Sequence, residues 1–155
     1  MPHKCLALAA ALMILPAAAQ QNPLARPPDR GDPAPLAGRW NGADLEDRSN
    51  CTHPENNGRH GTYAQYDFNV DTANHYLSMA QAGVTGLNCS WGGNYSNDEF
   101  HVDWSGQYNC TDGKAGSFHS KAFLITAKEM SIQLSIKLTG SETCDIDSVL
   151  GGSRY

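Results

Sequence analysis

The chain has 155 residues, a formal net charge of −5 and no cluster of Lys or Arg side chains. Nucleic acids and anionic lipid surfaces are bound by basic side chains that neutralise phosphates, so this composition disfavours both partners. We therefore expect no nucleic-acid binding and look for other partners along the chain.

Residues 1–19 have the pattern of a secretory signal peptide. His3 and Lys4 give a short positive start, residues 5–15 are apolar without interruption, and residues 17–19 are three alanines. The apolar run is too short to span a bilayer, and no later stretch is more apolar, so we expect no membrane insertion. The sequence predicts export to the periplasm or the extracellular medium, with cleavage near Ala19.

Residues 20–36 hold five of the eight prolines and are predicted to form a disordered linker. This linker contains Arg30-Gly31-Asp32, an integrin-type tripeptide, although so short a match also arises by chance in a polar segment. The remaining residues 37–155 are long enough to form one domain with a buried core.

The domain is predicted to be all-β. In "MSIQLSIKLTG" the apolar residues at 132, 134, 136 and 138 alternate with polar ones, which is typical of a half-buried strand. "EFHVDW" and "YAQYDFNV" repeat the pattern, and no segment of the domain has a helical period. We expect strands at 37–47, 60–71, 74–82, 85–95, 98–111, 116–127, 130–140 and 142–150. Their bulky residues predicted to face inward are Tyr66, Phe68, Phe100, Trp104, Ile132, Leu134 and Ile136.

Short, turn-rich connections favour a single antiparallel meander of about eight strands. Such a sheet must protect its edges, so we predict a small closed or partly open barrel, with a two-sheet β-sandwich as the alternative. The interior of an eight-stranded barrel is just wide enough to be filled by its own side chains or to hold one small ligand.

Four cysteines remain once the signal is removed, and three of them stand in a repeated Asn-Cys-Thr/Ser sequence. An even number in an exported chain predicts two disulfides. In a meander, alternate turns share one end of the sheet, and all four cysteines fall near that end. We favour the pairs Cys89–Cys110 and Cys51–Cys144, although the expected hairpin register places Cys89 nearer Trp104 than Cys110.

The first predicted strand opens with "LAGRWNG", and its Gly38-x-Trp40 resembles the opening of lipocalins and related calycin barrels. In that family the tryptophan plugs one end of the barrel beneath an arginine from near the C-terminus. The resemblance implies that Trp40 is such a plug and that Arg154 covers it.

The candidate binding site lies at the cysteine-rich end. The loop "SNCTHPENNGRH" is the longest in the domain, and long loops on a rigid scaffold commonly carry binding residues. We predict that a ligand or partner protein contacts loop 50–60 together with turn 111–116. The residues selected for this site are His53, His60, Trp91, Asp112 and Lys114.

The favoured function is a binding module for a small ligand, a glycan or a protein partner, including an inhibitor of a secreted enzyme. The sequence has no Gly-x-Ser-x-Gly motif, while aromatic residues are plentiful. The chain is expected to be a monomer without a cofactor or a bound metal. The aromatic residues that favour a binding module are Trp40, Trp91, Tyr95, Trp104 and Tyr108.

Two alternatives remain. A small secreted hydrolase or metal-dependent enzyme would use His53, His60 or the face formed by Glu99, His101 and Asp103, with His119 on the neighbouring strand. A structural envelope protein is the other alternative. The carboxylates at positions 44, 46 and 47 are interpreted as a solvated strand end.

Overall fold

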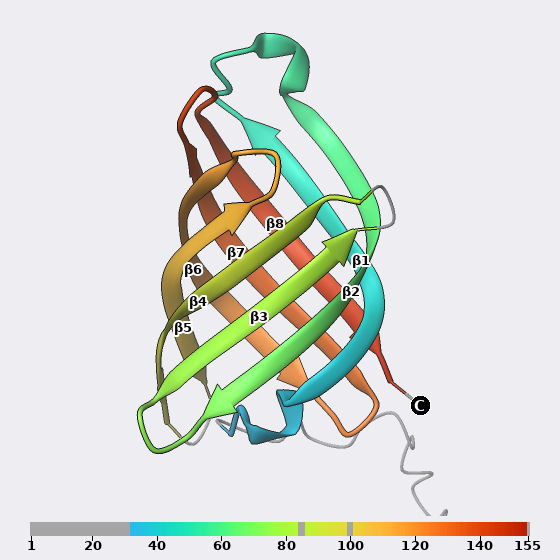
Figure 1. The fold of residues 1–155 in the computed structure, drawn as a ribbon, viewed down its shortest axis with the longest axis vertical. Coiled ribbons are helices and arrows are strands. Elements are labelled where there is room, and N and C mark those ends of the chain that lie inside the picture. The colour runs from blue at the N-terminus through green and yellow to red at the C-terminus, as the bar shows by residue number, and fades with distance from the viewer. Residues whose placement is uncertain (1–31, 84–85, 99–100, 155) are drawn as a thin grey trace, which may run out of the picture.

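The structure is a computed structural model that describes residues 32–83, 86–98 and 101–154. These residues form a closed antiparallel barrel in which each strand pairs with the next and β8 pairs with β1 (Figure 1). The predicted all-β meander is confirmed. Because the sheet closes on itself, the fold is the predicted barrel and not the alternative sandwich. The strands are β1 Gly38–Ser49, β2 Gly58–Asp71, β3 Tyr76–Gly83, β4 Asn88–Asn97, β5 Val102–Cys110, β6 Ala115–Ile125, β7 Glu129–Thr139 and β8 Cys144–Ser153.

Two short 3-10 helices complete the described elements, η1 at Ala34–Leu36 and η2 at Pro54–Asn56. No helix among the described residues has the length and apolar character needed to cross a membrane. The predicted signal peptide lies outside the described residues, as does all of the predicted linker except residues 32–36.

The barrel has two different ends. The β1–β2 loop with η2 and the β7–β8 turn lie together at the top of Figure 1, and we call this the disulfide end because both disulfides lie towards it. Helix η1 lies at the opposite end, which we call the plug end. Since every strand runs from one end to the other, the inward-facing residues of all eight strands share one enclosed space.

Trp40 closes the plug end. Its ring is fully buried, and its indole Nε1 donates a hydrogen bond to the carbonyl of Leu36, 2.7 Å away. The guanidinium carbon of Arg154 lies 4.4 Å from the ring centroid, while Nη1 and Nη2 donate to the carbonyls of Ala37 and Pro35. The residues at the two ends of the domain are therefore placed as the lipocalin resemblance implied.

The half of the barrel near the plug is packed with aromatic and aliphatic side chains. Trp104 is fully buried and meets Phe118 edge to face, with 4.4 Å between the ring centroids. Phe100 lies outside the described residues, but every other residue predicted to face inward is buried. The aromatic residues considered for binding are buried too, so they form core and cavity wall rather than an exposed patch: Trp40, Trp91, Tyr95, Trp104 and Tyr108.

Two facing glycines bring β4 and β5 into close approach. Gly93 and Gly106 are register partners. A Cβ on Gly93 would lie 1.9 Å from the carbonyl oxygen of Ser105, and one on Gly106 would lie 2.0 Å from that of Gly92. Only glycine therefore fits this part of the wall, and such pairs are typical of sites where a barrel sheet bends sharply.

Both predicted disulfides are present, Cys51–Cys144 and Cys89–Cys110. The expected register of the β4–β5 hairpin was wrong, because Cys89 lies directly opposite Cys110 while Trp104 lies opposite Tyr95. The reason is that β4 continues to Asn97, two residues beyond its predicted end, and β5 begins only at Val102.

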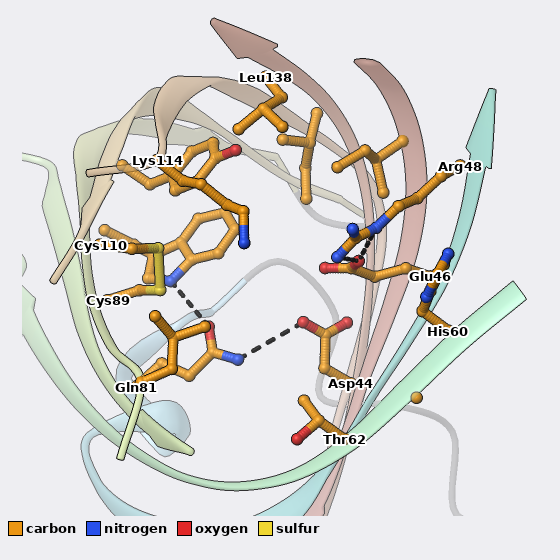
Figure 2. A pocket seen from close by; sticks show the side chains of 16 residues that line it. Asp44, Glu46, Arg48, His60, Thr62, Gln81, Cys89, Cys110, Lys114 and Leu138 are labelled. Carbon is orange, nitrogen blue, oxygen red and sulfur yellow. Dashed lines mark hydrogen bonds and ion pairs between the residues drawn. A yellow bond between two sulfur atoms is a disulfide. The ribbon is translucent and has the colours of Figure 1, made fainter. Parts of the chain in front are cut away.

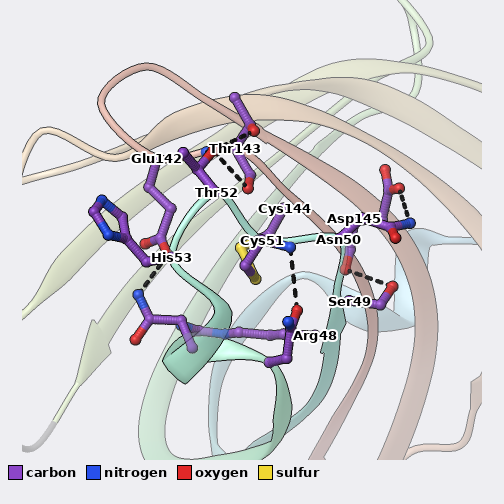
Figure 3. Close-up of a disulfide and its surroundings, with 12 residues drawn as sticks. Arg48, Ser49, Asn50, Cys51, Thr52, His53, Glu142, Thr143, Cys144 and Asp145 are labelled. Carbon is purple, nitrogen blue, oxygen red and sulfur yellow. Dashed lines mark hydrogen bonds between the residues drawn. A yellow bond between two sulfur atoms is a disulfide. The ribbon is translucent and has the colours of Figure 1, made fainter.

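In two of the three copies of the repeated motif, the threonine that follows the cysteine binds the chain on the other side of the disulfide. The amide of Thr52 donates to the carbonyl of Thr143, and the two threonine hydroxyls lie 2.7 Å apart (Figure 3). In the second disulfide, the amide of Thr111 donates to the carbonyl of Asn88 and its hydroxyl accepts from the Asn88 amide. The motif thus ties each disulfide to a local hydrogen-bond pair.

Replacing Trp40 by alanine should lower the free energy of unfolding by about 3–5 kcal/mol, the range for removing a buried large aromatic side chain. Chemical denaturation measures the change. Tyr63, which is 73% exposed, provides the control, and Tyr63→Ala should change stability by less than about 0.5 kcal/mol. Equal effects of the two substitutions would show that Trp40 does not close the barrel.

The two disulfides should differ in their contribution to stability. Their cysteines are 93 and 21 residues apart in sequence, and the entropy that a cross-link removes from the unfolded chain grows with loop length. The double alanine variant at positions 51 and 144 should therefore lose about 1 kcal/mol more than the one at positions 89 and 110. Denaturation of both variants tests this, and a larger loss from the shorter loop would contradict it.

Candidate functional site

A cavity of about 250 Å³ lies inside the barrel towards the disulfide end. Its volume lies between the roughly 150 Å³ that holds a benzene and the about 300–1,000 Å³ of sites for drug-sized ligands. One small organic molecule is therefore the size that fits. The lining residues, drawn in Figure 2, are Asp44, Glu46, Arg48, His60, Gly61, Thr62, Gln81, Leu87, Cys89, Trp91, Tyr108, Cys110, Lys114, Ile136, Leu138 and Ile146.

The cavity has a polar wall and an apolar wall. Strands β1 to β3 supply most of the charged and hydrogen-bonding side chains, such as Asp44, Glu46 and Gln81, and the β5–β6 turn adds Lys114. Strands β7 and β8 supply only Ile136, Leu138 and Ile146. A ligand that satisfies both walls must itself carry a polar group on one side and an apolar body on the other.

The polar wall exists because the second half of β1 carries charged residues at its inward positions and an apolar residue at an outward one. Counting in steps of two from the buried Trp40 leads to Asp44, Glu46 and Arg48, whereas Leu45 between them points outward and is 60% exposed. Our interpretation of these carboxylates as a solvated strand end was therefore wrong for Asp44 and Glu46. Asp44 is only 3% exposed.

A chain of hydrogen bonds holds Asp44 in place. The hydroxyl of Ser148 on β8 donates to Asp44 Oδ1 at 2.7 Å, and the amide Nε2 of Gln81 on β3 lies 3.4 Å from Oδ2. The Gln81 carbonyl oxygen in turn accepts from the indole Nε1 of Trp91 at 3.0 Å. Figure 2 shows the side chains of Asp44 and Gln81 pointing toward each other across the cavity.

Asp44 is a buried carboxylate without a cationic partner among the described residues. Glu46 and Arg48 form an ion pair of their own, with Arg48 Nη2 and Nε each 2.6 Å from Glu46 Oε2. Burial, followed by the charge of the nearby Glu46 carboxylate, raises the pKa of Asp44 to about 6, although the hydrogen bonds from Ser148 and Gln81 and the positive charge of Arg48 act in the opposite direction. At neutral pH Asp44 is therefore largely ionised, and its charge is offset only in part by Arg48, which is already paired with Glu46.

A second buried polar group lies deeper in the barrel. Tyr66 is fully buried, and its hydroxyl has no hydrogen-bond partner among the described residues. Burial raises the pKa of this hydroxyl, and the charges of Asp44 and Glu46 raise it further, so the group stays protonated. The interior thus holds a second polar group besides the carboxylate, although Tyr66 is not among the residues that line the cavity.

The structure brings together three of the five residues selected from the sequence. His60, Trp91 and Lys114 line the cavity, and Asp112 lies behind Lys114, whose Nζ it binds at 2.7 Å. His53 is not among the lining residues, and its exposed ring lies 3.7 Å from Glu55. The important residues that the sequence interpretation missed are Asp44, Glu46, Arg48 and Gln81.

The histidine–carboxylate face proposed for an enzyme lies on the outer surface. His119 Nδ1 is 3.3 Å from Asp103 Oδ1, with both side chains 57% exposed, and Glu99 lies outside the described residues. Within the described ranges, the group with metal-ligand spacing is Cys51, Glu142 and Cys144. Because both of these cysteines are joined in a disulfide, they offer no thiolate to a metal.

No protein-family model matches the chain, and no match was found among curated proteins or solved structures. What the protein does must therefore be inferred from the cavity itself. Its distinguishing features are one buried carboxylate without an ion-pair partner among the described residues, a neutralised ion pair and an apolar wall, all at the open end of a barrel that is plugged at the other.

Replacing Asp44 by asparagine should make the protein more stable at neutral pH. The folded-state pKa is raised from the usual 3.8 to about 6, so the stability associated with the neutral carboxyl is complete below pH 3.8 and is lost as the pH rises through 6. This rise corresponds to about 3 kcal/mol. The difference in unfolding free energy between Asp44→Asn and wild type should therefore grow by about 3 kcal/mol from low to neutral pH.

Denaturation across this pH range makes the measurement. Asp47 lies on the same strand and is exposed, so Asp47→Asn is the matched control and should stay within about 0.5 kcal/mol of wild type. A constant difference between Asp44→Asn and wild type at all pH values would show that Asp44 is not buried as a charge.

Proposed function

We propose that the protein is an exported binding protein that holds one small organic ligand in the cavity at the disulfide end. The observation that carries this proposal is a barrel plugged at one end by Trp40 and hollow towards the other, with the buried carboxylate of Asp44 inside the hollow. Clefts that combine an apolar lining with a few placed polar groups are the usual form of small-molecule sites.

The lining residues support binding better than catalysis. Covalent catalysis needs a nucleophile next to a base, but Cys89 and Cys110 are joined in a disulfide. His60 is the single histidine among the lining residues, and its Nε2 lies 3.0 Å from the carbonyl oxygen of Asn56. The raised pKa of Asp44 would suit a general acid. A raised pKa is equally expected for a buried carboxylate that binds a cationic ligand when that ligand is absent.

The cross-links support a preformed site. Cys89–Cys110 is part of the cavity wall, and Cys51–Cys144 joins the base of the β1–β2 loop to the start of β8 (Figure 3). Further hydrogen bonds tie the same loop down, including those from Asn56 to Glu142 and from the Cys51 amide to the Asn57 side chain. A rigid mouth lowers the entropy that is lost on binding.

The predicted signal peptide and the two disulfides support a location in the periplasm or outside the cell, because disulfides persist in oxidising compartments. A binding protein in such a location would capture its ligand from the surroundings of the cell. A protein partner that contacts loop 50–60 and turn 111–116, the alternative predicted from the sequence, would instead have to insert a side chain into the cavity.

NMR of the indole N–H groups can locate the ligand, because the three tryptophans occupy different parts of the barrel. When the protein is titrated with a set of small cationic, neutral and anionic compounds, a binder should shift the Trp91 resonance and leave that of Trp40 unchanged. Trp91 lines the cavity, whereas Trp40 lies at the plug. Leu138→Phe, which enlarges a side chain of the apolar wall, should weaken binding about tenfold or more.

Val149→Phe is the matched control, since Val149 lies on β8 and is 37% exposed on the outer face. This variant should bind the same compounds as wild type. Compounds that shift no Trp91 resonance, or that lose affinity equally in both variants, would show that the cavity is not the binding site.

A further inference from the structure

We infer that the ligand of the cavity is a small organic cation, a primary amine with an apolar body whose ammonium group binds the carboxylate of Asp44. This inference rests on the proposed function and adds the chemical class of the ligand.

The charges of the cavity select a cation. A buried charge is costly unless an opposite charge or several hydrogen bonds compensate it. The arginine and the lysine at the cavity are already paired, Arg48 with Glu46 at 2.6 Å and Lys114 with Asp112 at 2.7 Å. The Nε2 of His60, the third basic residue of the lining, lies 3.0 Å from the carbonyl oxygen of Asn56. An anionic ligand would have to break one of these pairs and would also meet Asp44, whereas a cation would supply the partner that Asp44 lacks.

Asp44 has room for further donors. An ionised carboxylate offers about four acceptor positions, and the described residues fill two of them, through the 2.7 Å bond from Ser148 and the longer 3.4 Å contact from Gln81. Both donors are neutral, so neither cancels the charge. An ammonium group has three donors and a full positive charge, which matches the acceptor positions and the charge that remain.

The surroundings of Asp44 offer secondary partners for the same ammonium group. Thr62 lies opposite Asp44 in the β1–β2 register and also lines the cavity, and its hydroxyl, which donates to the Tyr63 carbonyl at 3.3 Å, keeps its acceptor positions. The Gln81 carbonyl oxygen accepts from Trp91 and has a second lone pair. The polar wall therefore presents acceptors around one carboxylate, as a site for a primary amine requires.

The apolar wall, together with the neighbouring Trp91 and Tyr108, suits a flat or branched apolar body. Trp91 and Tyr108 are stacked at 4.5 Å with 16° between their planes, so together they form one rigid aromatic surface. Ile136 and Leu138 continue this surface on β7. A volume of about 250 Å³ admits a single ring or a short branched chain next to the ammonium group.

Two matched series of compounds test the inference by calorimetry at neutral pH. One series is phenethylamine, phenethyl alcohol and phenylacetate, and the other is isoamylamine, isoamyl alcohol and isovalerate, so that within each series only the polar group changes. At least one amine should bind about tenfold or more tightly than its alcohol, in line with the strength of a hydrogen bond to a charged group. The carboxylates should bind more weakly than the alcohols.

Asp44→Asn keeps the shape of the side chain and removes its charge, so it should abolish the preference for the amine while leaving the affinity for the alcohol unchanged. Asp47→Asn makes the same change on the outer face of β1 and should retain the full preference. Unshifted Trp40 and Trp104 resonances in both variants show that the barrel is intact.

Equal binding of amine and alcohol, tighter binding of a carboxylate, or an unchanged preference in Asp44→Asn would each overturn the inference while leaving the cavity as a ligand site. If none of the six compounds binds, the inference also falls. The proposed function falls with it only if the wider set of compounds in the Trp91 titration fails to bind as well.

Discussion

The pairing of β8 with β1 is the constraint on which the rest of the structure depends. It closes the sheet, so that the alternate residues of every strand face one interior with two ends. The same pairing brings Arg154 over Trp40 at the plug end and Cys144 against Cys51 at the other. It also places Ser148 of β8 beside Asp44 of β1, so the carboxylate of the cavity is held by the strand that closes the barrel.

The two halves of the interior have opposite roles. Near the plug, Trp40, Trp104 and Tyr66 fill the space with rings, and this packing provides the stability that a small barrel needs. Towards the disulfide end the inward positions of β1 carry Asp44, Glu46 and Arg48, and the space between them and the apolar wall stays open. Stability and the proposed binding are thus separated along the axis of one barrel, with the disulfides stiffening the open half.

Much of the fold could be predicted because it depends on local patterns. The alternation at residues 132–138 defined β7, and the common end of alternate turns was enough to pair Cys51 with Cys144 and Cys89 with Cys110. The cavity could not be predicted in the same way. From sequence alone, a charged residue on the inward face of a strand cannot be told from a solvent-exposed one until it is known that the sheet closes into a barrel. The strand period of two residues, counted from Trp40 to Asp44, was nevertheless a usable signal that Asp44 faces inward. Gln81 was hidden for the same reason, because its role depends on contacts with β1 and β4.

A crystal structure of the protein purified from its native source would test the central claim, that the hollow end of the barrel is a ligand site, most directly. Our account predicts electron density for a small molecule between the Asp44 carboxylate and the Trp91–Tyr108 wall, with a hydrogen-bond donor within about 3 Å of an Asp44 oxygen. Density for a ligand on the outer face, with Leu138 and Arg48 folded inward to fill the cavity, would contradict it.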